Sequence, residues 1–220
     1  MASYIQTLIN EGEHQQLDFK FGVNDSRKIA RTLAAFANTD GGRLLLGVKD
    51  NGSIAGVRSD EEYYMMEAGA HLYCKPPVPF EINEWEENGR NVLEVIVKKS
   101  EQIHSAPDKD GVYKIFIRVG DQNYMANSVL LKVWNKRKNK TGVKITFTHI
   151  EHSLIHYLEE KGKISLSTFK KLSGLSVKRC EHILADFIVL DILRINYSES
   201  GVFYTLNPDF RLNEEANNLQ

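Results

Sequence analysis

Three charged side chains near the start of the chain have the types that metal-dependent phosphodiester chemistry uses: Glu13, Asp18 and Lys20. Leu17 to Phe21 alternates between apolar and charged residues, which predicts a strand with Asp18 and Lys20 together on the face opposite its apolar side chains. Clustered carboxylates hold Mg²⁺ or Mn²⁺, the metal activates water, and a lysine offsets phosphate charge. The same residue types also fit a surface ion pair between strand neighbours without a metal, and they favour this simpler interpretation.

Basic residues suited to phosphate contact occur at two places in the first 131 residues. Arg27, Lys28 and Arg31 lie on the side of a predicted helix opposite its apolar positions, and each phosphate contact would add a salt-dependent attraction. A solvated helix face has the same composition. Arg118 follows an aromatic strand and precedes a glycine that permits close approach of a ligand. We therefore expect Arg118 either to contact phosphate or to pair with an acid such as Asp121.

The most basic segment is 132–144, which has six basic residues and no acid. Within it, Lys136, Arg137 and Lys138 are expected to contact nucleic acid unless the segment is simply a solvated linker. Residues 1–131, by contrast, carry 14 basic and 19 acidic residues, and the whole chain has a net charge of -1. Any contact with nucleic acid must therefore come from local patches, because the molecule has no general positive field.

The order of predicted elements divides the chain into two domains. Residues 1–131 are predicted to form a helix, a strand, a helix, a hairpin, a helix and further strands, which is a mixed α/β domain. The Asp-Asn-Gly sequence at 50–52 is typical of a type I′ hairpin turn, which is a structural explanation for these residues. The segment 132–144 is expected to be a basic linker, and 213–220 a frayed tail.

Residues 145–212 are predicted to form three helices, with a tight turn before the third, and then a β-hairpin, which is the order of a winged helix-turn-helix domain. Ser176, Lys178 and Arg179 begin the third helix, where base and phosphate contacts usually lie. Acidic residues follow in the same helix, so dimerisation or domain packing is an equal alternative to DNA contact. The predicted fold class is α+β, a mixed α/β domain followed by a small winged helix.

Composition excludes several classes of protein. The hydrophobic share of 42% and the charged share of 26% are ordinary for a globular protein, and no apolar run reaches the roughly 18 residues of a membrane span. No signal peptide is visible, and Cys74 and Cys180 suggest neither a disulfide scaffold nor a metal site. Gly41, Gly42 and Gly47 lack the Gly-Lys-Ser/Thr ending of a phosphate-binding loop, which argues against ATP hydrolysis. We expect a cytoplasmic protein without membrane contact or cofactor.

Several segments between residues 10 and 130 form a recognisable series. They are Gly12–Lys20, Ala34–Gly42, Leu46–Val48 with Asp50–Gly52, and Ile117–Gly120 with Asn123. Together and in this order they resemble the Schlafen-type Alba-like domain, which makes the resemblance fairly specific. Asp18 is a departure, because the family usually has a glutamate there.

The resemblance implies more than one function. Bacterial relatives are commonly described as DNA-binding or transcription-regulator proteins, often with a C-terminal winged helix, and others as ATP-binding. Animal relatives include RNA endonucleases with three carboxylates at the active site. Those carboxylates match Glu13 and Asp18, with Asp50 as the third.

The leading hypothesis is a DNA-binding transcriptional regulator that is not an enzyme and that forms a homodimer, by analogy with winged-helix regulators. RNA is the second candidate partner. The main alternative is a metal-dependent endoribonuclease that uses Glu13, Asp18, Asp50 and Lys20 with Mg²⁺ or Mn²⁺. A third alternative is a protein-interaction module whose acidic first domain binds a protein partner.

Overall fold

The computed structural model describes residues 2–57, 59–139 and 146–210. The chain divides into two compact units, Met1–Ala126 and Asn127–Gln220. Residues 132–138, expected to begin a linker, instead belong to a helix of the second unit that starts at Ser128. Buried valines fix this helix to its own unit, a signal that the basic side chains of the segment obscure in the sequence. The rest of the expected linker beyond Asn139, and the expected tail 213–220, lie outside the described residues.

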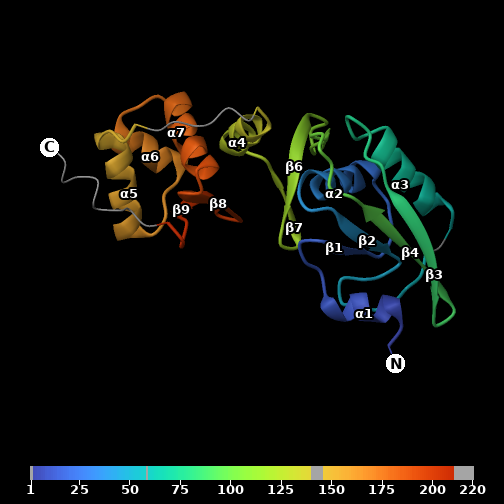
Figure 1. Cartoon of the computed structure of the whole chain (residues 1–220). Coiled ribbons are helices and arrows are strands. Elements are labelled where there is room, and N and C mark those ends of the chain that lie inside the picture. The colour runs from blue at the N-terminus through green and yellow to red at the C-terminus, as the bar shows by residue number, and fades with distance from the viewer. Residues whose placement is uncertain (1, 58, 140–145, 211–220) are drawn as a thin grey trace. The chain divides into compact units, whose positions relative to one another are not determined.

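The first unit is built on a four-stranded sheet. Its strands, in spatial order, are β1 (Leu17–Lys20), β2 (Gly42–Leu46), β4 (Arg90–Val97) and β3 (Glu81–Glu87). Strand β1 is parallel to β2, and the other neighbours are antiparallel. Helix α1 (Tyr4–Glu11) covers one face, and α2 (Ser26–Asn38) and α3 (Glu61–His71) cover the other (Figure 1).

Helix α2 lies between two sheets. One side of α2 faces the four-stranded sheet, and another side packs against a three-stranded sheet (Figure 1). The strands of this second sheet are β5 (Ser105–Pro107), β6 (Tyr113–Val119) and β7 (Gln122–Met125). Of the two residues that could cap α2 by sequence, Asn24 and Asp25, it is Asp25 that caps it through its side chain. Alanines at 30, 34, 35 and 37 are buried, and such small side chains let both sheets approach the helix closely. Residues on α2 therefore reach both sheets.

The helix ends where two glycines allow close packing. Gly41 has a positive φ of 71°, which few other residues tolerate. A Cβ on Gly42 would lie 2.5 Å from the ring of Phe36, so this glycine lets β2 pass against the helix. Gly41 and Gly42 therefore serve to end the helix and to let the strand pack against it.

Two local predictions for this unit need correction. Asp18 and Lys20 do share a face of β1, but Asp18 is only 3% exposed, so their ion pair is not the surface pair that the sequence suggested. The turn at 50–52 is not of type I′, because Asn51 does not have the positive φ that this turn requires. Instead the Asn51 side chain accepts the backbone N–H of Ser53, and only one bridge, between Val48 and Ile54, follows in place of a hairpin.

The second unit contains four helices and a two-stranded hairpin among its described residues. They are α4 (Ser128–Lys138), α5 (His149–Lys161), α6 (Leu166–Ser173), α7 (Val177–Val189), β8 (Leu193–Ser198) and β9 (Gly201–Leu206). Helices α5 to α7 and the hairpin lie where the sequence predicts three helices and two strands. Their apolar sides form one core with Val129 and Val133 of α4. None of the described helices has the length and apolar character needed to cross a bilayer.

Candidate phosphate-binding site

A buried ion pair joins β1 to β6. Nη2 of Arg118 lies 3.2 Å from Oδ1 of Asp18, and the two side chains are 2% and 4% exposed. The same nitrogen donates to the backbone carbonyl oxygens of His14 and Leu17. Arg118 is therefore enclosed by protein and does not present its charge to a ligand, which corrects one expected phosphate contact. Its acidic partner is Asp18, not Asp121.

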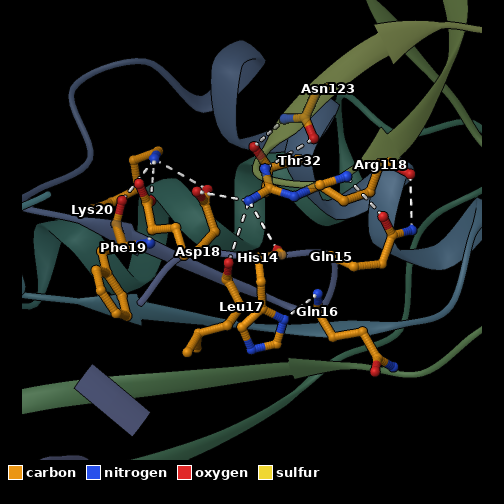
Figure 2. Close-up of polar contacts among 12 residues, drawn as sticks. His14, Gln15, Gln16, Leu17, Asp18, Phe19, Lys20, Thr32, Arg118 and Asn123 are labelled. Carbon is orange, nitrogen blue, oxygen red and sulfur yellow. Dashed lines mark hydrogen bonds and ion pairs between the residues drawn. The ribbon is translucent and has the colours of Figure 1, made fainter. Parts of the chain in front are cut away.

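The ion pair extends in both directions through polar side chains. Nζ of Lys20 lies 3.1 Å from Oδ2 of Asp18, so each carboxylate oxygen has its own cation. Nη1 of Arg118 donates to Oδ1 of Asn123, and Nδ2 of Asn123 donates to the Thr32 hydroxyl oxygen at 2.9 Å. Figure 2 shows this series of contacts from Lys20 on β1, through Arg118 on β6, to Thr32 on α2. We call these five residues the Arg118 network.

Hydrogen bonds around β6 hold Arg118 in place. Nε2 of Gln15 donates to the carbonyl oxygen of Arg118, and Oε1 of Gln15 accepts the N–H of Gly120, both at 2.9 Å. The Thr39 hydroxyl accepts the N–H of Arg118, and the Asn38 amide donates to a carbonyl oxygen of β6. Gln15, Asn38 and Thr39 belong to the segments Gly12–Lys20 and Ala34–Gly42, which carry the resemblance described above. Their side chains thus position β6.

Glu13 lies beside the network, and its pKa is raised from 4.5 to about 7. Burial is the largest cause of the raised pKa, and a hydrogen bond with the Asp18 carboxyl, which favours the protonated form of Glu13, is the second. The negative charge of Asp18 raises the pKa further. The backbone N–H of Phe19, which donates to Oε1 of Glu13 at 2.8 Å, and Lys20, 3.8 Å away, act in the opposite direction. Near neutral pH Glu13 is therefore partly protonated.

A cavity of about 290 Å³ opens where β1 ends and α2 begins. Lys20, Lys28 and Arg31 line it, and we call it the basic cavity. Thr32 and Asn123 line it as well, so both ends of the Arg118 network reach this cavity. The network therefore positions three of the polar side chains that surround the space.

Two cations of the basic cavity have no acidic partner among the described residues. Lys28 is exposed, and Nε of Arg31 donates only to the carbonyl oxygen of Arg27, which leaves the outer nitrogens of Arg31 for a ligand. Asp25 also lines the cavity, but its Oδ1 accepts the N–H groups of Arg27 and Lys28 as the helix cap. Arg27 itself is not part of the lining; its guanidinium lies over the ring of Tyr73.

The basic segment of the second unit has acidic partners instead. Lys132 and Lys136, four residues apart, lie on one face of α4 and point toward α7. The pairs are Lys132–Glu181 at 3.2 Å, Lys136–Asp186 at 2.8 Å and Arg137–Asp191 at 3.8 Å. Lys136 and Arg137, which the sequence suggested as nucleic-acid contacts, are thus engaged within the unit, whereas Lys138 is exposed.

The start of α7 exposes a second group of basic side chains. Ser176 accepts the N–H of Arg179 and caps the helix, while Lys178 and Arg179 are exposed. Lys170 and Lys171, exposed in the last turn of α6, precede the same turn. Sequence reasoning missed these two lysines because it considered only the third helix of the domain.

The first unit matches the protein-family model described as "Schlafen, AlbA_2" over residues 13–127, a little more than half of the chain. The chain belongs to this family. The matched range contains the whole Arg118 network and the basic cavity.

Two solved structures resemble this Schlafen AlbA_2 chain. The DIP2311 protein of Corynebacterium diphtheriae is 21% identical, with a TM-score of 0.43 over 56% of this chain and 28% of that protein. The N-terminal domain of a Nitrosomonas europaea protein described as ATP-dependent DNA helicase RecG-related is 19% identical, with a TM-score of 0.38 over 68% of this chain and 97% of that domain. The chain thus spans less than a third of the Corynebacterium protein. No curated protein matches it significantly.

The carboxylates of this Schlafen AlbA_2 domain do not fit a divalent metal ion. Within the described part of the chain, no three carboxylate, histidine or cysteine side chains form a group that could hold one, so Glu13, Asp18 and Asp50 are not assembled as a trio. Both oxygens of Asp18 already face cations, and Glu13 is partly protonated near pH 7. Asp50 is exposed beside its turn.

Thr32 and Asn123 are the site residues that sequence reasoning did not single out. Thr32 lies on α2 and is 4% exposed, and a single threonine in a predicted helix gives no sign of a site. Asn123 belongs to a family-like segment, but its partner is 91 residues away in sequence. Contacts of that separation come from the packing of β7 on α2, which local periodicity does not report.

Proposed function

We propose that this Schlafen AlbA_2 protein binds nucleic acid and is not an enzyme. The observation that carries the proposal is the basic cavity, in which Lys28 and Arg31 have no acidic partner among the described residues. Positive side chains gathered in a concave site attract phosphate groups, and contacts with phosphate supply most of the affinity of proteins for nucleic acid.

For the second unit we propose a winged helix-turn-helix that binds duplex DNA. In support, α6 and α7 are separated by a short turn, and the β8–β9 hairpin follows them. Exposed cations flank that turn at Lys170, Lys171, Lys178 and Arg179. In such domains the start of the second helix of the motif contacts base edges and phosphates. A cytoplasmic transcriptional regulator that binds paired half-sites as a homodimer is the role that fits this arrangement.

The test measures affinity for labelled duplex DNA, single-stranded DNA and RNA at low and at ~0.2 M salt. We expect binding that weakens steeply with salt. Replacing Lys178 and Arg179 by glutamine should reduce duplex binding by about tenfold, since each phosphate contact contributes to the electrostatic attraction. The matched control is Lys109→Gln with Lys114→Gln, which removes the same charge from exposed positions.

Absence of affinity for all three nucleic acids at low salt would overturn the proposal and favour a protein-interaction module. Equal loss of binding in the control variant would assign the effect to net charge, not to the start of α7.

The alternative of a metal-dependent nuclease rests on the approach of Glu13, Asp18 and Lys20. Its chemistry needs carboxylates that are ionised and open to a metal, whereas Asp18 is buried between Arg118 and Lys20. Incubation with structured RNA and Mn²⁺ decides the matter. Cleavage by the wild type that an Asp18→Asn variant with intact secondary structure lacks would establish a nuclease.

A further inference from the structure

We propose that the basic cavity holds a terminal phosphate, the phosphate monoester at the end of a nucleic-acid strand. This inference rests on the proposed function and adds the chemical group that the cavity recognises. The first unit would then bind the ends of nucleic-acid strands, whereas α7 is proposed to contact duplex DNA.

The volume of the cavity limits what it accommodates. Sites for small molecules commonly measure about 300–1,000 Å³, and the basic cavity is about 290 Å³. It therefore suits a single phosphate with its adjoining sugar, not a stretch of backbone. An internal phosphate would have to enter with chain on both sides, whereas a terminal phosphate enters from one side.

The charge of the lining matches a dianion. Lys20 and Arg118 share the single carboxylate of Asp18. Lys28 and Arg31 have no acidic partner among the described residues, and Asp25, the cap of α2, is the acid of the lining. A phosphate monoester carries a charge of roughly -1.5 to -2 at pH 7, while an internal phosphodiester carries a single charge. The excess of cations over carboxylates around the cavity consequently favours the monoester.

One neutral donor in the lining completes the site. The Thr32 hydroxyl accepts from Asn123, which leaves its own hydrogen available to a ligand oxygen. Thr32 is 4% exposed and lines the cavity, so this donor is held in a fixed position. Such preorganised hydrogen bonds to an anion are stronger than those between neutral groups.

The net charge of the first unit disfavours a long strand. Residues 1–126 carry 14 basic and 19 acidic residues, so the unit as a whole is acidic. A backbone that ran across this unit would meet repulsion within the Debye length of about 10 Å. A strand end that enters one cavity avoids most of this repulsion.

The test compares short single strands of one sequence that carry either a terminal phosphate or a terminal hydroxyl, by fluorescence anisotropy with an internal label. We expect the phosphorylated strand to bind about tenfold tighter, as one additional charged contact implies. Replacing Lys28 and Arg31 by glutamine should abolish this preference, while Lys109→Gln with Lys114→Gln should retain it. A nucleoside monophosphate serves as competitor.

Each outcome separates the two proposals. Equal affinity for both strands would overturn recognition of strand ends but leave nucleic-acid binding intact, and no affinity for either strand or for duplex DNA would overturn both. If the Lys28 and Arg31 variant still prefers the phosphorylated strand, the basic cavity is not the site that recognises the phosphate. Competition by the mononucleotide at the concentration at which the strand binds would mean that the ligand is a free nucleotide.

Discussion

Two groups of basic residues in this protein look alike in sequence and differ in what surrounds them. Lys28 and Arg31 in the first unit line a cavity without acidic partners among the described residues. Lys132 and Lys136 in the second unit lie on α4 and pair with acids of α7 at 3.2 and 2.8 Å. The segment with more basic residues, 132–144, therefore uses Lys132 and Lys136 in ion pairs within its unit. The smaller group, Lys28 and Arg31, is the one open to a ligand.

The difference shows that local charge density is a poor guide to binding. The acids Glu181 and Asp186 stand about 50 residues after their partners, so counting charges within 132–144 cannot include them. In the sequence, these acids argue against a DNA-binding role for α7. In the structure, Lys132 and Lys136 of α4 neutralise them. A basic segment is available to a polyanion only where the fold brings no acid to it.

The largest expected effect comes from removing the support of the basic cavity. Arg118→Met should destabilise the first unit by about 3–5 kcal/mol, because it leaves Asp18 buried next to Glu13 with one cation fewer. Urea unfolding measures this in a Trp134→Phe background, where Trp85 is the remaining tryptophan and reports on the first unit. Asp18→Asn combined with Arg118→Met should recover part of the loss. A loss under about 1 kcal/mol would mean that the ion pair does not hold this region together.

The next effect depends on pH and concerns Glu13. Its pKa is raised from 4.5 to about 7, so the folded state favours the protonated form. The stability that comes from this proton is complete below about pH 4.5 and is lost as the pH rises to about 7. Glu13→Gln imitates the protonated form and should make the first unit more stable than wild type at pH 8, by on the order of 2 kcal/mol. Near pH 4.5 the two proteins should be alike. A variant that is less stable at both pH values would show that the Glu13 carboxylate is favoured in the fold.

Much of the fold follows from local sequence patterns. Alternation predicted β1, and the cap of α2 is one of the two residues that the sequence offered for it. Helices α5, α6 and α7 and the β8–β9 hairpin follow the predicted order of three helices and two strands. Short strands and the helix α4 were missed, because β5 and β7 have three and four residues and the basic side chains of α4 obscure its apolar face.

The sequence identified several residues of the candidate site but not how they are arranged in space. Lys28 and Arg31 were named as phosphate contacts, and Asp18 and Lys20 as a pair on one face. Arg118 was expected to contact phosphate or to pair with an acid such as Asp121, because the sequence could not show that it is buried against Asp18 of β1. The cavity itself is lined by two segments, 20–32 and 116–123, that lie far apart in the chain, and no local pattern contains that information.

A smaller effect is expected from replacing the paired lysines of α4. Lys132→Gln with Lys136→Gln should destabilise the second unit by about 1–2 kcal/mol, because both pairs are largely shielded from solvent. Trp134 reports this unfolding in a Trp85→Phe background. Affinity for nucleic acid should fall no more than in the Lys109 and Lys114 control. If binding is lost while stability is kept, the two basic groups have the opposite roles to those assigned here.

The smallest effect is expected at Arg137. Its pair with Asp191 spans 3.8 Å, and the two side chains are 55% and 80% exposed, so water screens the charges and both chains keep their freedom. Arg137→Gln should change the stability of the second unit by less than about 0.5 kcal/mol. Measured beside the Lys132 and Lys136 variant, it tests whether burial of each pair, and not the charge of the segment, determines its contribution. An Arg137 effect as large as that of Lys136→Gln alone would mean that the positive charge of α4 acts as a whole, and the distinction between committed and open basic groups would then fail in this unit.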